Sequence, residues 1–382
     1  MKYMKYFWLA LSVVVLAIIL SAGICSYIAY NLVGDVGGAF KLVRTKTMLE
    51  RYYYGDIEKG KLIEGAIKGM VEAVDDPYTS YLGKKDFKRL TEMTQGSFSG
   101  IGVVFGKKDH QYQIMSVIEG NPGAKAGIKE GDIIVGINGE STAKMSMDAV
   151  ANNIRGPIDT EVVIELQDKK GGLRKVTVVR KEIKTPSVGS RMLDNGKVGY
   201  IRISNFSETT GVDFKHKLEE LEGKGMQALV LDLRSNPGGL LNTGVEVAQL
   251  LVPKGPIVSV VDKQGKKHTE YSELEKVKFP LAVLVNGGTA SAAEIVSGAV
   301  KDTKAGRLFG EKTYGKGCVQ HVYRLSKDDA VKITVADYYT PSGASIHKKG
   351  IEPDEKVVLP EDYSSDTQLK AAKAYLEKEI AQ

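Results

Sequence analysis

Residues 281–320, LAVLVNGGTASAAEIVSGAVKDTKAGRLFGEKTYGKGCVQ, place the strongest constraint on the fold. The continuous apolar run Leu281–Val285 predicts a strand that is buried on both faces. After a turn of small residues, the spacing of the next apolar positions predicts a helix (Ile295, Val296, Ala299, Val300). A second glycine-rich turn enters the alternating stretch 318–323, which predicts another strand. Strands that alternate with helices in this way indicate an α/β core.

Ser291 lies where the predicted strand gives way to the predicted helix. Its hydroxyl would sit among the free N–H groups of a helix N-terminus, where an oxyanion is stabilised. The sequence Ser291-Ala292-Ala293-Glu294 also fits a capping box, which taken alone is the commoner role for such a serine. Small residues on both sides of Ser291 favour the close approach of a substrate backbone, so both interpretations stay open.

Lys316 stands between two glycines and has two alternative interpretations. The stretch Gly310–Lys316 matches the spacing of a phosphate-binding P-loop, but Gly317 occupies the position that needs Ser or Thr. Residues 318–323 moreover alternate like a strand and do not open a helix. A nucleotide site is therefore not supported, and an exposed turn lysine is the plain alternative to a functional one.

Two motifs in this segment, NGGTASAAEI and GEKTYGKGCVQ, resemble the catalytic region of the carboxyl-terminal processing (tail-specific) proteases. The resemblance runs from about Tyr52 to about Leu376 and implies a serine protease with no metal and no cofactor. It assigns Ser291 as the nucleophile, Lys316 as the base and Gln320 as the residue that orients the lysine. The stretch LDLRSNPGG similarly implies an oxyanion hole formed by the N–H groups of Gly239 and Ala292, with Gly238 as the less favoured choice.

A lysine base must lose its proton near neutral pH, although its ordinary pKa is about 10.4. Burial lowers the pKa of a lysine, and an amide such as Gln320 can hold the amine without adding negative charge. A Ser-His-Asp triad is less well supported, since none of the five histidines has a compelling position. His321 would point away from Gln320 on an alternating strand, and Cys318 is better explained as a small packing residue.

The N-terminal segment contains no charged residue from Tyr6 to Tyr30. This length predicts a transmembrane helix within residues 1–34, with the catalytic part outside the cytoplasmic membrane. The small residues Ser21-Ala22-Gly23 leave signal cleavage and secretion as the alternative. Cys25 lies within this segment and is distant from Cys318, so no disulfide framework is implied.

Residues 41–95 have a helical pattern that ends in the turn-rich stretch 75–82, DDPYTSYL. The family has a similar segment here, and we interpret the region as a helical collar or homodimer element without a role in the chemistry.

Residues 96–182 resemble a PDZ domain, with Asn138-Gly139 as a hairpin turn. The resemblance implies that the backbone N–H groups of Gly100, Ile101, Gly102 and Val103 hold a terminal carboxylate. A helix with Met147, Val150 and Ile154 would form the other wall of the pocket. The expected ligand is an apolar free C-terminus of a protein substrate, and a domain used only for internal packing is the alternative.

The sequence thus predicts an α/β (α+β) protease core at 183–360, an inserted PDZ domain and a C-terminal helix within 361–382. The net charge of +6 is spread along the 382 residues without a basic block, so nucleic acid is not an expected partner. The expected function is a Ser-Lys endopeptidase of envelope or secreted proteins. The alternatives are an inactive PDZ adaptor and a serine hydrolase of non-peptide esters.

Overall fold

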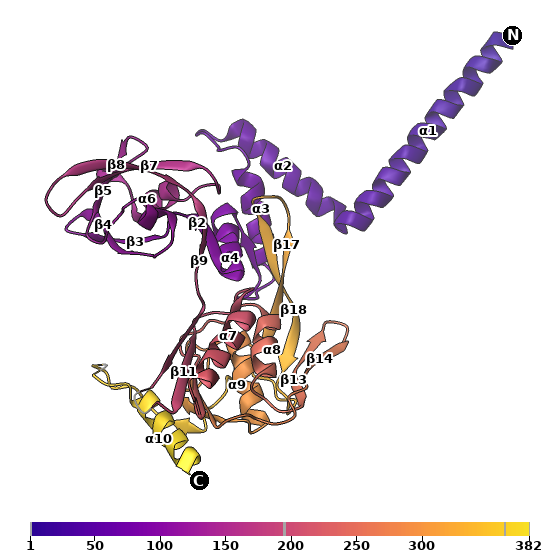
Figure 1. The fold of residues 1–382 in the computed structure, drawn as a ribbon. Coiled ribbons are helices and arrows are strands. Elements are labelled where there is room, and N and C mark those ends of the chain that lie inside the picture. The colour runs from indigo at the N-terminus through magenta and orange to yellow at the C-terminus, as the bar shows by residue number, and fades with distance from the viewer. Residues whose placement is uncertain (1, 194–195, 363, 382) are drawn as a thin grey trace. The chain divides into compact units, whose positions relative to one another are not determined.

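The structure is a computed structural model that describes residues 2–193, 196–362 and 364–381. The chain divides into two compact units, Met1–Asp75 and Asp76–Gln382, and each is described on its own (Figure 1).

The first unit is helical and consists of α1 (Lys2–Val33), α2 (Val36–Tyr52) and α3 (Lys61–Glu72). Asp35 caps α2, because its carboxylate accepts a hydrogen bond of 2.8 Å from the N–H of Gly38. All residues of α2 and α3 are described, and none of them is buried.

Within the described residues, no helix has both the length and the apolar character that crossing a membrane requires. Residues 2–33 do form the helix α1, but a helical backbone alone is not enough to cross a membrane. The prediction of a transmembrane helix in residues 1–34 is therefore not supported. The side chain of Cys25 lies outside the described part of the chain.

The second unit contains a PDZ-like antiparallel sheet with the order β3-β4-β5-β7-β8, in which β6 pairs with β5. Its strands are β3 (Val103–Lys108), β4 (Gln111–Val117), β5 (Ile133–Ile137), β6 (Glu140–Ser141), β7 (Glu161–Gln167) and β8 (Leu173–Val179). Asn138 and Gly139 have φ of 51° and 85° between β5 and β6, as a type I′ hairpin turn requires. The helix α6 (Met147–Ile154) packs on this sheet through Val150 and Ile154.

A two-stranded ribbon leads into and out of this sheet. β2 (Ser97–Gly100) pairs antiparallel with β9 (Lys181–Lys184), so the chain leaves the protease core and returns to it at neighbouring points. The PDZ-like sheet is thus an insertion, as the sequence predicted.

The protease core is built on a six-stranded sheet with the order β10-β11-β12-β15-β16-β19. β11, β12, β15, β16 and β19 run parallel to one another, and β10 runs antiparallel to β11. The strands are β10 (Val188–Met192), β11 (Val198–Ile203), β12 (Ala228–Asp232), β15 (Leu281–Val285), β16 (Arg307–Gly310) and β19 (Glu355–Lys356). Every residue of β12 and β15 is buried, which explains their unbroken apolar sequence.

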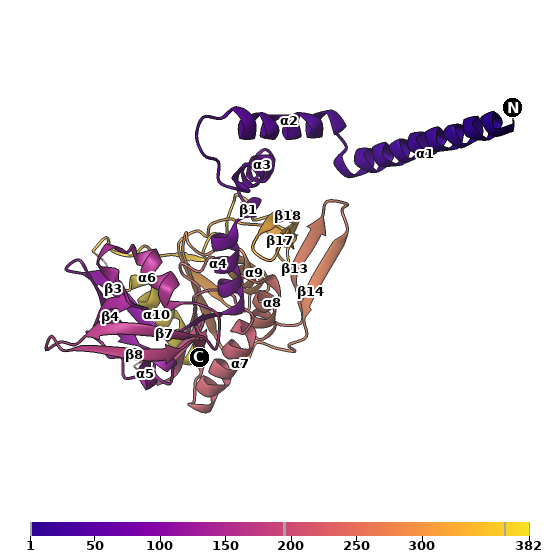
Figure 2. The ribbon, with the colours of Figure 1, turned by 90° about the horizontal axis from the view of Figure 1, so that it is seen from above.

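Helices cover both faces of this sheet. α7 (Thr210–Gly223), α8 (Leu241–Gln249) and α9 (Ala292–Asp302) share one apolar cluster with Leu229, Leu231 and Val283, and Figures 1 and 2 show these helices side by side. α10 (Thr367–Ala381) packs on the other face, where Ala372 and Leu376 contact the cluster of Val230 and Leu284. The alternation of these strand residues between two clusters follows from the two-residue period of a strand.

A second sheet has the order β1-β18-β13-β14, with β17 also paired to β18. Its strands are β1 (Ser80–Leu82), β13 (Gly255–Asp262), β14 (Lys267–Ser272), β17 (Cys318–Arg324) and β18 (Ala330–Tyr339), and α4 (Lys84–Gln95) follows β1. The segment after residue 75, assigned to a helical collar from the sequence, therefore contributes a strand to the protease unit.

Candidate active site

Three loops meet at one edge of the central sheet. They follow β12, β15 and β16, which are adjacent and parallel, so their carboxyl ends lie at the same edge. The first loop carries Gly238 and Gly239, the second carries Ser291 and the third carries Lys316. The order of the strands in the sheet thus brings together three loops that are far apart in the sequence.

The loop that carries Ser291 is fixed by hydrogen bonds to the loop after β12. The hydroxyl of Thr289 donates to the carbonyl of Leu233 at 2.8 Å, and the N–H of Ala290 donates to the carbonyl of Asn236 at 2.9 Å. Ser291 itself has φ of 56° and ψ of −120°. An ordinary N-cap residue has an extended backbone, so this strained conformation distinguishes Ser291 from a simple helix cap.

Glu294, in the first turn of α9, holds the serine and lysine loops together. Its side chain is fully buried, and Oε2 accepts hydrogen bonds of 2.9 Å from the N–H groups of both Ser291 and Lys316. Oε1 accepts from the hydroxyl of Thr313 at 2.6 Å and from the N–H of Gly315 at 2.7 Å. The capping-box pattern indicated the bond to Ser291, but the sequence gave no sign of the bonds to the lysine loop.

Tyr338 on β18 also connects these two loops, through hydrogen bonds to their backbone carbonyl oxygens. Its hydroxyl lies 2.6 Å from the carbonyl oxygen of Lys316 and 3.1 Å from that of Ser291. Burial, followed by the nearby charge of Glu294, raises the pKa of Tyr338 well above its ordinary value. Tyr338 therefore stays a neutral hydrogen-bond donor, and together with Glu294 it fixes both backbone segments.

The amine of Lys316 is partly buried, and in the described part of the chain it makes no hydrogen bond or ion pair. Its nearest aromatic contact is Tyr78, whose ring centroid lies 5.2 Å from Nζ. Burial is the main cause that lowers the pKa of Lys316 below its ordinary value, and the charge of Lys332 acts in the same direction. Cys318, Glu294 and Asp76 oppose this shift without reversing it.

The N–H groups near Ser291 have an arrangement suited to an oxyanion. The N–H of Gly238 donates to Oδ1 of Asn236 at 2.8 Å and is therefore occupied. Among the described hydrogen bonds, the N–H groups of Gly239 and Ala292 have no acceptor. Gly238 must be glycine, because a Cβ there would lie 2.7 Å from the Cβ of Ser291.

Gln320 lies on β17 close to this region, but the structure gives its amide other partners than the lysine. Its Nε2 lies 3.2 Å from Sγ of Cys318 and 3.4 Å from Oγ1 of Thr334. Oγ1 of Thr334 donates in turn to Asp76 at 2.6 Å. A contact between Gln320 and Lys316 therefore stays a prediction. Cys318 is buried, as expected for a packing residue.

The turn-rich segment 75–82 was expected to have no role in the chemistry, but the structure brings Tyr78 to Lys316. Asp76 anchors the segment by accepting hydrogen bonds from Thr79 and Thr334, each of 2.6 Å. Sequence reasoning missed this contact because 238 residues separate the two side chains and a turn motif does not specify its tertiary neighbour. The DPYT pattern was the available signal.

No histidine of the described residues is hydrogen-bonded to Ser291 or Lys316. His321 is exposed and its ring lies 4.6 Å from that of Tyr323 at an angle of 60°, whereas the ring of His347 packs edge-on against Tyr78 at 5.9 Å. Among the described residues, no group of three His, Cys, Asp or Glu side chains is arranged to hold a metal ion.

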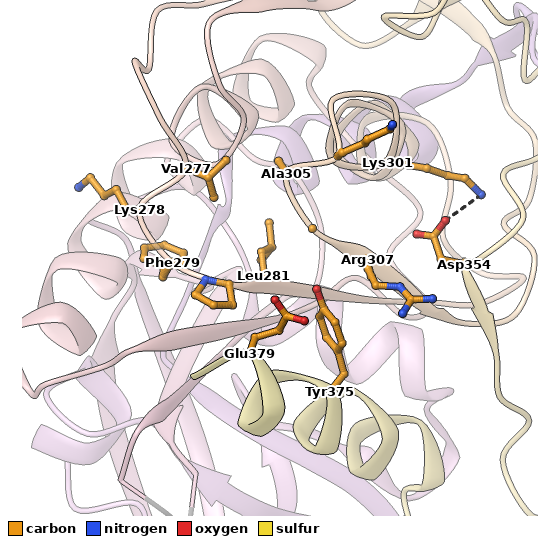
Figure 3. A pocket seen from close by; sticks show the side chains of 13 residues that line it. Val277, Lys278, Phe279, Leu281, Lys301, Ala305, Arg307, Asp354, Tyr375 and Glu379 are labelled. Atoms are coloured by element: carbon orange, nitrogen blue, oxygen red, sulfur yellow. Dashed lines mark ion pairs between the residues drawn. The ribbon is translucent and has the colours of Figure 1, made fainter. Parts of the chain in front are cut away.

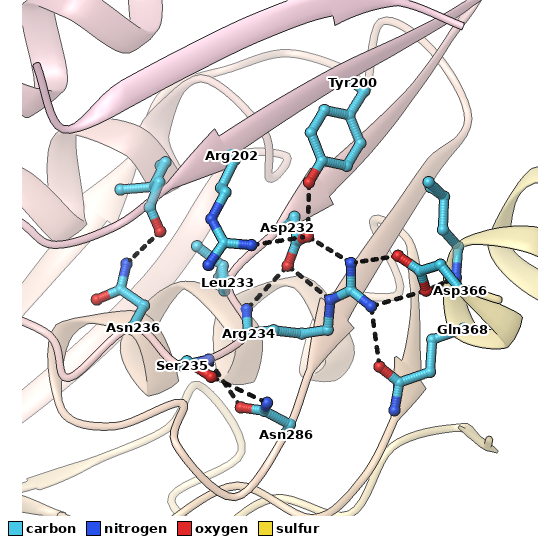
Figure 4. Close-up of polar contacts among 12 residues, drawn as sticks. Tyr200, Arg202, Asp232, Leu233, Arg234, Ser235, Asn236, Asn286, Asp366 and Gln368 are labelled. Carbon is cyan, nitrogen blue, oxygen red and sulfur yellow. Dashed lines mark hydrogen bonds and ion pairs between the residues drawn. The ribbon is translucent and has the colours of Figure 1, made fainter. Parts of the chain in front are cut away.

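A buried ionic network supports the loop after β12 (Figure 4). The guanidinium of Arg234 forms ion pairs of 2.6 Å with Asp232 and 2.8 Å with Asp366, which directly precedes α10. Tyr200 donates to Asp232 at 2.7 Å, and Gln368 accepts from Arg234 at 3.1 Å. The network thus connects the strand that leads to Gly239 with the C-terminal helix.

A hollow of about 640 Å³ lies at the opposite ends of the parallel strands, so it is separate from the candidate site (Figure 3). Leu281 and Arg307, the first residues of β15 and β16, line it together with Lys301 and Tyr375. Lys301 is paired with Asp354 at 3.5 Å.

In the PDZ-like sheet, β3 is an edge strand, as peptide addition to a sheet requires. The N–H groups of Ile101 and Gly102 have no acceptor among the described hydrogen bonds. Gly100 pairs with Lys181 and Val103 pairs with Val117. Val150 and Ile154 are buried in the domain core and Met147 is exposed, so α6 presents only Met147 of the three residues expected in the pocket.

Three family models match the chain: peptidase family S41 at residues 197–357, PDZ domain at 113–168 and activating protease CtpB N-terminal domain at 34–86. The carboxy-terminal processing protease CtpA of Bacillus subtilis (strain 168) is 40% identical over 88% of this chain and 72% of its own length. The chain belongs to the S41 family of carboxy-terminal processing proteases.

Other S41 relatives agree with this assignment. The carboxyl-terminal-processing protease of Synechocystis sp. (strain ATCC 27184 / PCC 6803 / Kazusa) is 37% identical over 81% of this chain and 74% of its own. The solved photosystem II D1 C-terminal processing protease has 31% identity and a TM-score of 0.50, and the match covers 92% and 93% of the two chains. The family and the α/β protease fold with a PDZ domain, both predicted from the sequence, are confirmed.

Proposed function

We propose that this S41 protease is a serine endopeptidase with Ser291 as nucleophile and Lys316 as general base. The observation that carries the proposal is the shared carboxylate of Glu294, which accepts the N–H groups of both residues and so fixes their loops side by side. The lowered pKa of Lys316 supports the role of base, because a neutral amine is needed to accept the serine proton.

The proposed reaction begins when Oγ of Ser291 attacks the scissile carbonyl and its proton passes to Nζ of Lys316. The carbonyl oxygen becomes an oxyanion that the N–H groups of Gly239 and Ala292 stabilise. The lysine then returns the proton to the leaving amine, which yields an acyl-enzyme that water hydrolyses by the same steps in reverse order. Gln320 is proposed to orient the lysine once substrate is bound.

We also propose that the PDZ domain recognises the free, apolar C-terminus of a protein substrate at residues 100–103. The N–H groups of Ile101 and Gly102, which have no acceptor among the described hydrogen bonds, and the open edge of β3 support this assignment. No cofactor or metal is needed for the proposed chemistry. A location outside the cytoplasm and a homodimer remain predictions from the sequence.

Labelling and turnover test the proposal against its alternatives. A fluorophosphonate probe should label the full chain but not Ser291→Ala, and the full chain should cleave peptides, whatever its activity on simple esters. Absence of both labelling and turnover would support an inactive adaptor, whereas ester turnover without peptide cleavage would support the non-peptide hydrolase. Protein C-termini that appear in cells only with active enzyme would identify the substrates.

A further inference from the structure

Tyr78 is the one side chain outside the proposed dyad whose ring faces the Lys316 amine in the described part of the chain. Its centroid lies 5.2 Å from Nζ, within the range in which a cation is attracted by the face of an aromatic ring. The amine has no hydrogen-bond or ion-pair partner among the described residues, and the ring is its one close cation–π contact there.

The ring is held in this place by its surroundings. The N–H of Tyr78 donates to Asp76 at 3.2 Å, and the carboxylate of Asp76 also accepts from Thr334 on β18. Two residues after Tyr78 the chain enters β1, where Ser80 pairs with Lys332 of β18. His347 packs edge-on against the ring from another loop. These contacts fix the position of Tyr78 before any substrate binds.

The hydroxyl of Tyr78 does not itself act as acid or base near neutral pH. Burial, with Tyr314 next, raises the pKa of Tyr78 to about 12. The side chain therefore remains neutral, and the face of its ring is the part that acts on Lys316.

Resting on the proposed dyad, we propose that Tyr78 is a positioning residue for Lys316 that stabilises the ammonium formed when Ser291 gives up its proton. The bond from Oγ to the acyl carbon forms as the proton moves to Nζ, so positive charge develops on the amine in the transition state. A carboxylate facing the amine would keep the lysine protonated beforehand. A neutral ring attracts the new charge more weakly and leaves the free amine available.

The pH dependence of the reaction can separate this role from a purely structural one. The titratable and charged groups that influence the amine come from several elements and are Asp76, Glu294, Cys318 and Lys332, whereas Tyr314 and His347 interact with Tyr78. Removing the ring while keeping an apolar cover destabilises only the ammonium and moves the activity profile to lower pH. Opening the site to water removes the desolvation and moves the profile to higher pH.

The experiment compares three variants of the full chain by the pH profile of kcat/KM. Tyr78→Phe should keep activity within about threefold and leave the profile in place. On the alkaline plateau Tyr78→Leu should lower kcat roughly three- to thirtyfold, the range of a partly buried cation–π contact, and the profile should shift to lower pH. Tyr78→Ala should lower kcat and shift the profile upward. A fall in kcat without any shift in either variant would overturn the proposal in favour of a structural role.

Tyr81→Leu is the matched control, because it removes another ring of the same segment, one whose hydroxyl donates to Asp329 at 2.9 Å. It should leave kcat and the pH profile unchanged within about twofold. Lys316→Ala is the control for the dyad: if it retains activity, the proposed base is wrong, irrespective of Tyr78.

A second measurement avoids substitutions that prevent folding. Phenylalanine with one, two or three ring fluorines can replace Tyr78 without changing its shape, while each fluorine weakens the negative face of the ring. On the alkaline plateau, where the lysine is neutral before reaction, the logarithm of kcat/KM should fall in step with the number of fluorines. Equal activity across the fluorinated series would overturn the proposal.

Discussion

The backbone N–H groups of Ser291 and Lys316 donate to the same oxygen atom, Oε2 of Glu294, at 2.9 Å each. A single buried carboxylate therefore sets the spacing of the two loops. Any change at this carboxylate acts on the serine and the lysine together, although neither side chain touches it.

Glu294→Gln should weaken the enzyme and the fold together. The amide keeps one acceptor oxygen but presents N–H groups to two of the four donors that now bind the carboxylate. Each buried donor left unpaired costs about 1–3 kcal/mol, so for two donors we expect a loss of about 2–6 kcal/mol in the free energy of unfolding, and at least a tenfold fall in kcat. Urea unfolding and steady-state kinetics measure both.

Glu352→Gln is the control for this change, since Glu352 forms an exposed ion pair with Lys312 in the same region. It should alter stability by less than about 1 kcal/mol. Full activity in Glu294→Gln would show that the two loops hold their spacing by other contacts.

Ser291→Ala and Lys316→Ala should each abolish peptide cleavage while the thermal unfolding curve stays that of a folded protein. The nucleophile and the base act in one step, so the double variant should be no less active than either single variant. Most of the turnover surviving in Lys316→Ala would exclude the lysine as base.

Activity should rise from neutral to mildly alkaline pH, with an apparent pKa below the ordinary lysine value of about 10.4. The sign follows from burial, which lowers the pKa of Lys316 and so raises the fraction of neutral amine at a given pH. Gln320→Glu should move the profile to higher pH, because an added negative charge stabilises the ammonium. Gln320→Met adds no charge and serves as control; equal profiles for the two variants would show that position 320 does not act on the lysine.

Arg234→Met should destabilise the fold more than Asp366→Asn does. Loss of the guanidinium leaves the carboxylate of Asp232, which is 0% exposed, with only its longer ion pair of 3.6 Å to Arg202, at a cost of up to about 3–5 kcal/mol. The side chain of Asp366 is 38% exposed, so in Asp366→Asn water replaces part of the ion pair that Arg234 loses. The free energy of unfolding should therefore fall by about 1 kcal/mol. Urea unfolding of the two variants ranks them, and the reverse order would contradict the network shown in Figure 4.

Amidation of the C-terminus of a protein substrate should lower kcat/KM roughly tenfold, the scale of one lost hydrogen bond to a charged group. The proposed site at Gly100–Val103 gains a charge-assisted contact from a free carboxylate and a poorer one from an amide. Short peptides that enter the active site directly serve as the control and should be affected much less. Equal cleavage of free and amidated proteins, together with no effect of deleting residues 97–180, would exclude recognition by the PDZ domain.

The amino-acid sequence alone determined the family, the order of the domains and the residues of the proposed dyad. These features appear as local sequence patterns. The apolar run Leu281–Val285 predicts a buried strand and the Asn138-Gly139 pair predicts a hairpin. The motifs that contain Ser291 and Lys316 are each continuous in the sequence. Such features can be predicted from the sequence because strand burial and turn conformation depend mainly on neighbouring residues.

Tertiary structure decided what those residues touch. The bonds from Glu294 to the lysine loop, the bridge from Tyr338 and the approach of Tyr78 to Lys316 all join segments that are remote in the sequence. The order of β12, β15 and β16 in the sheet and the pairing of β1 with β18 create these contacts. A hydrogen bond between remote segments leaves no periodicity in either of them, so only the packed chain shows which buried carboxylate holds the lysine loop and which ring lies near the amine of Lys316.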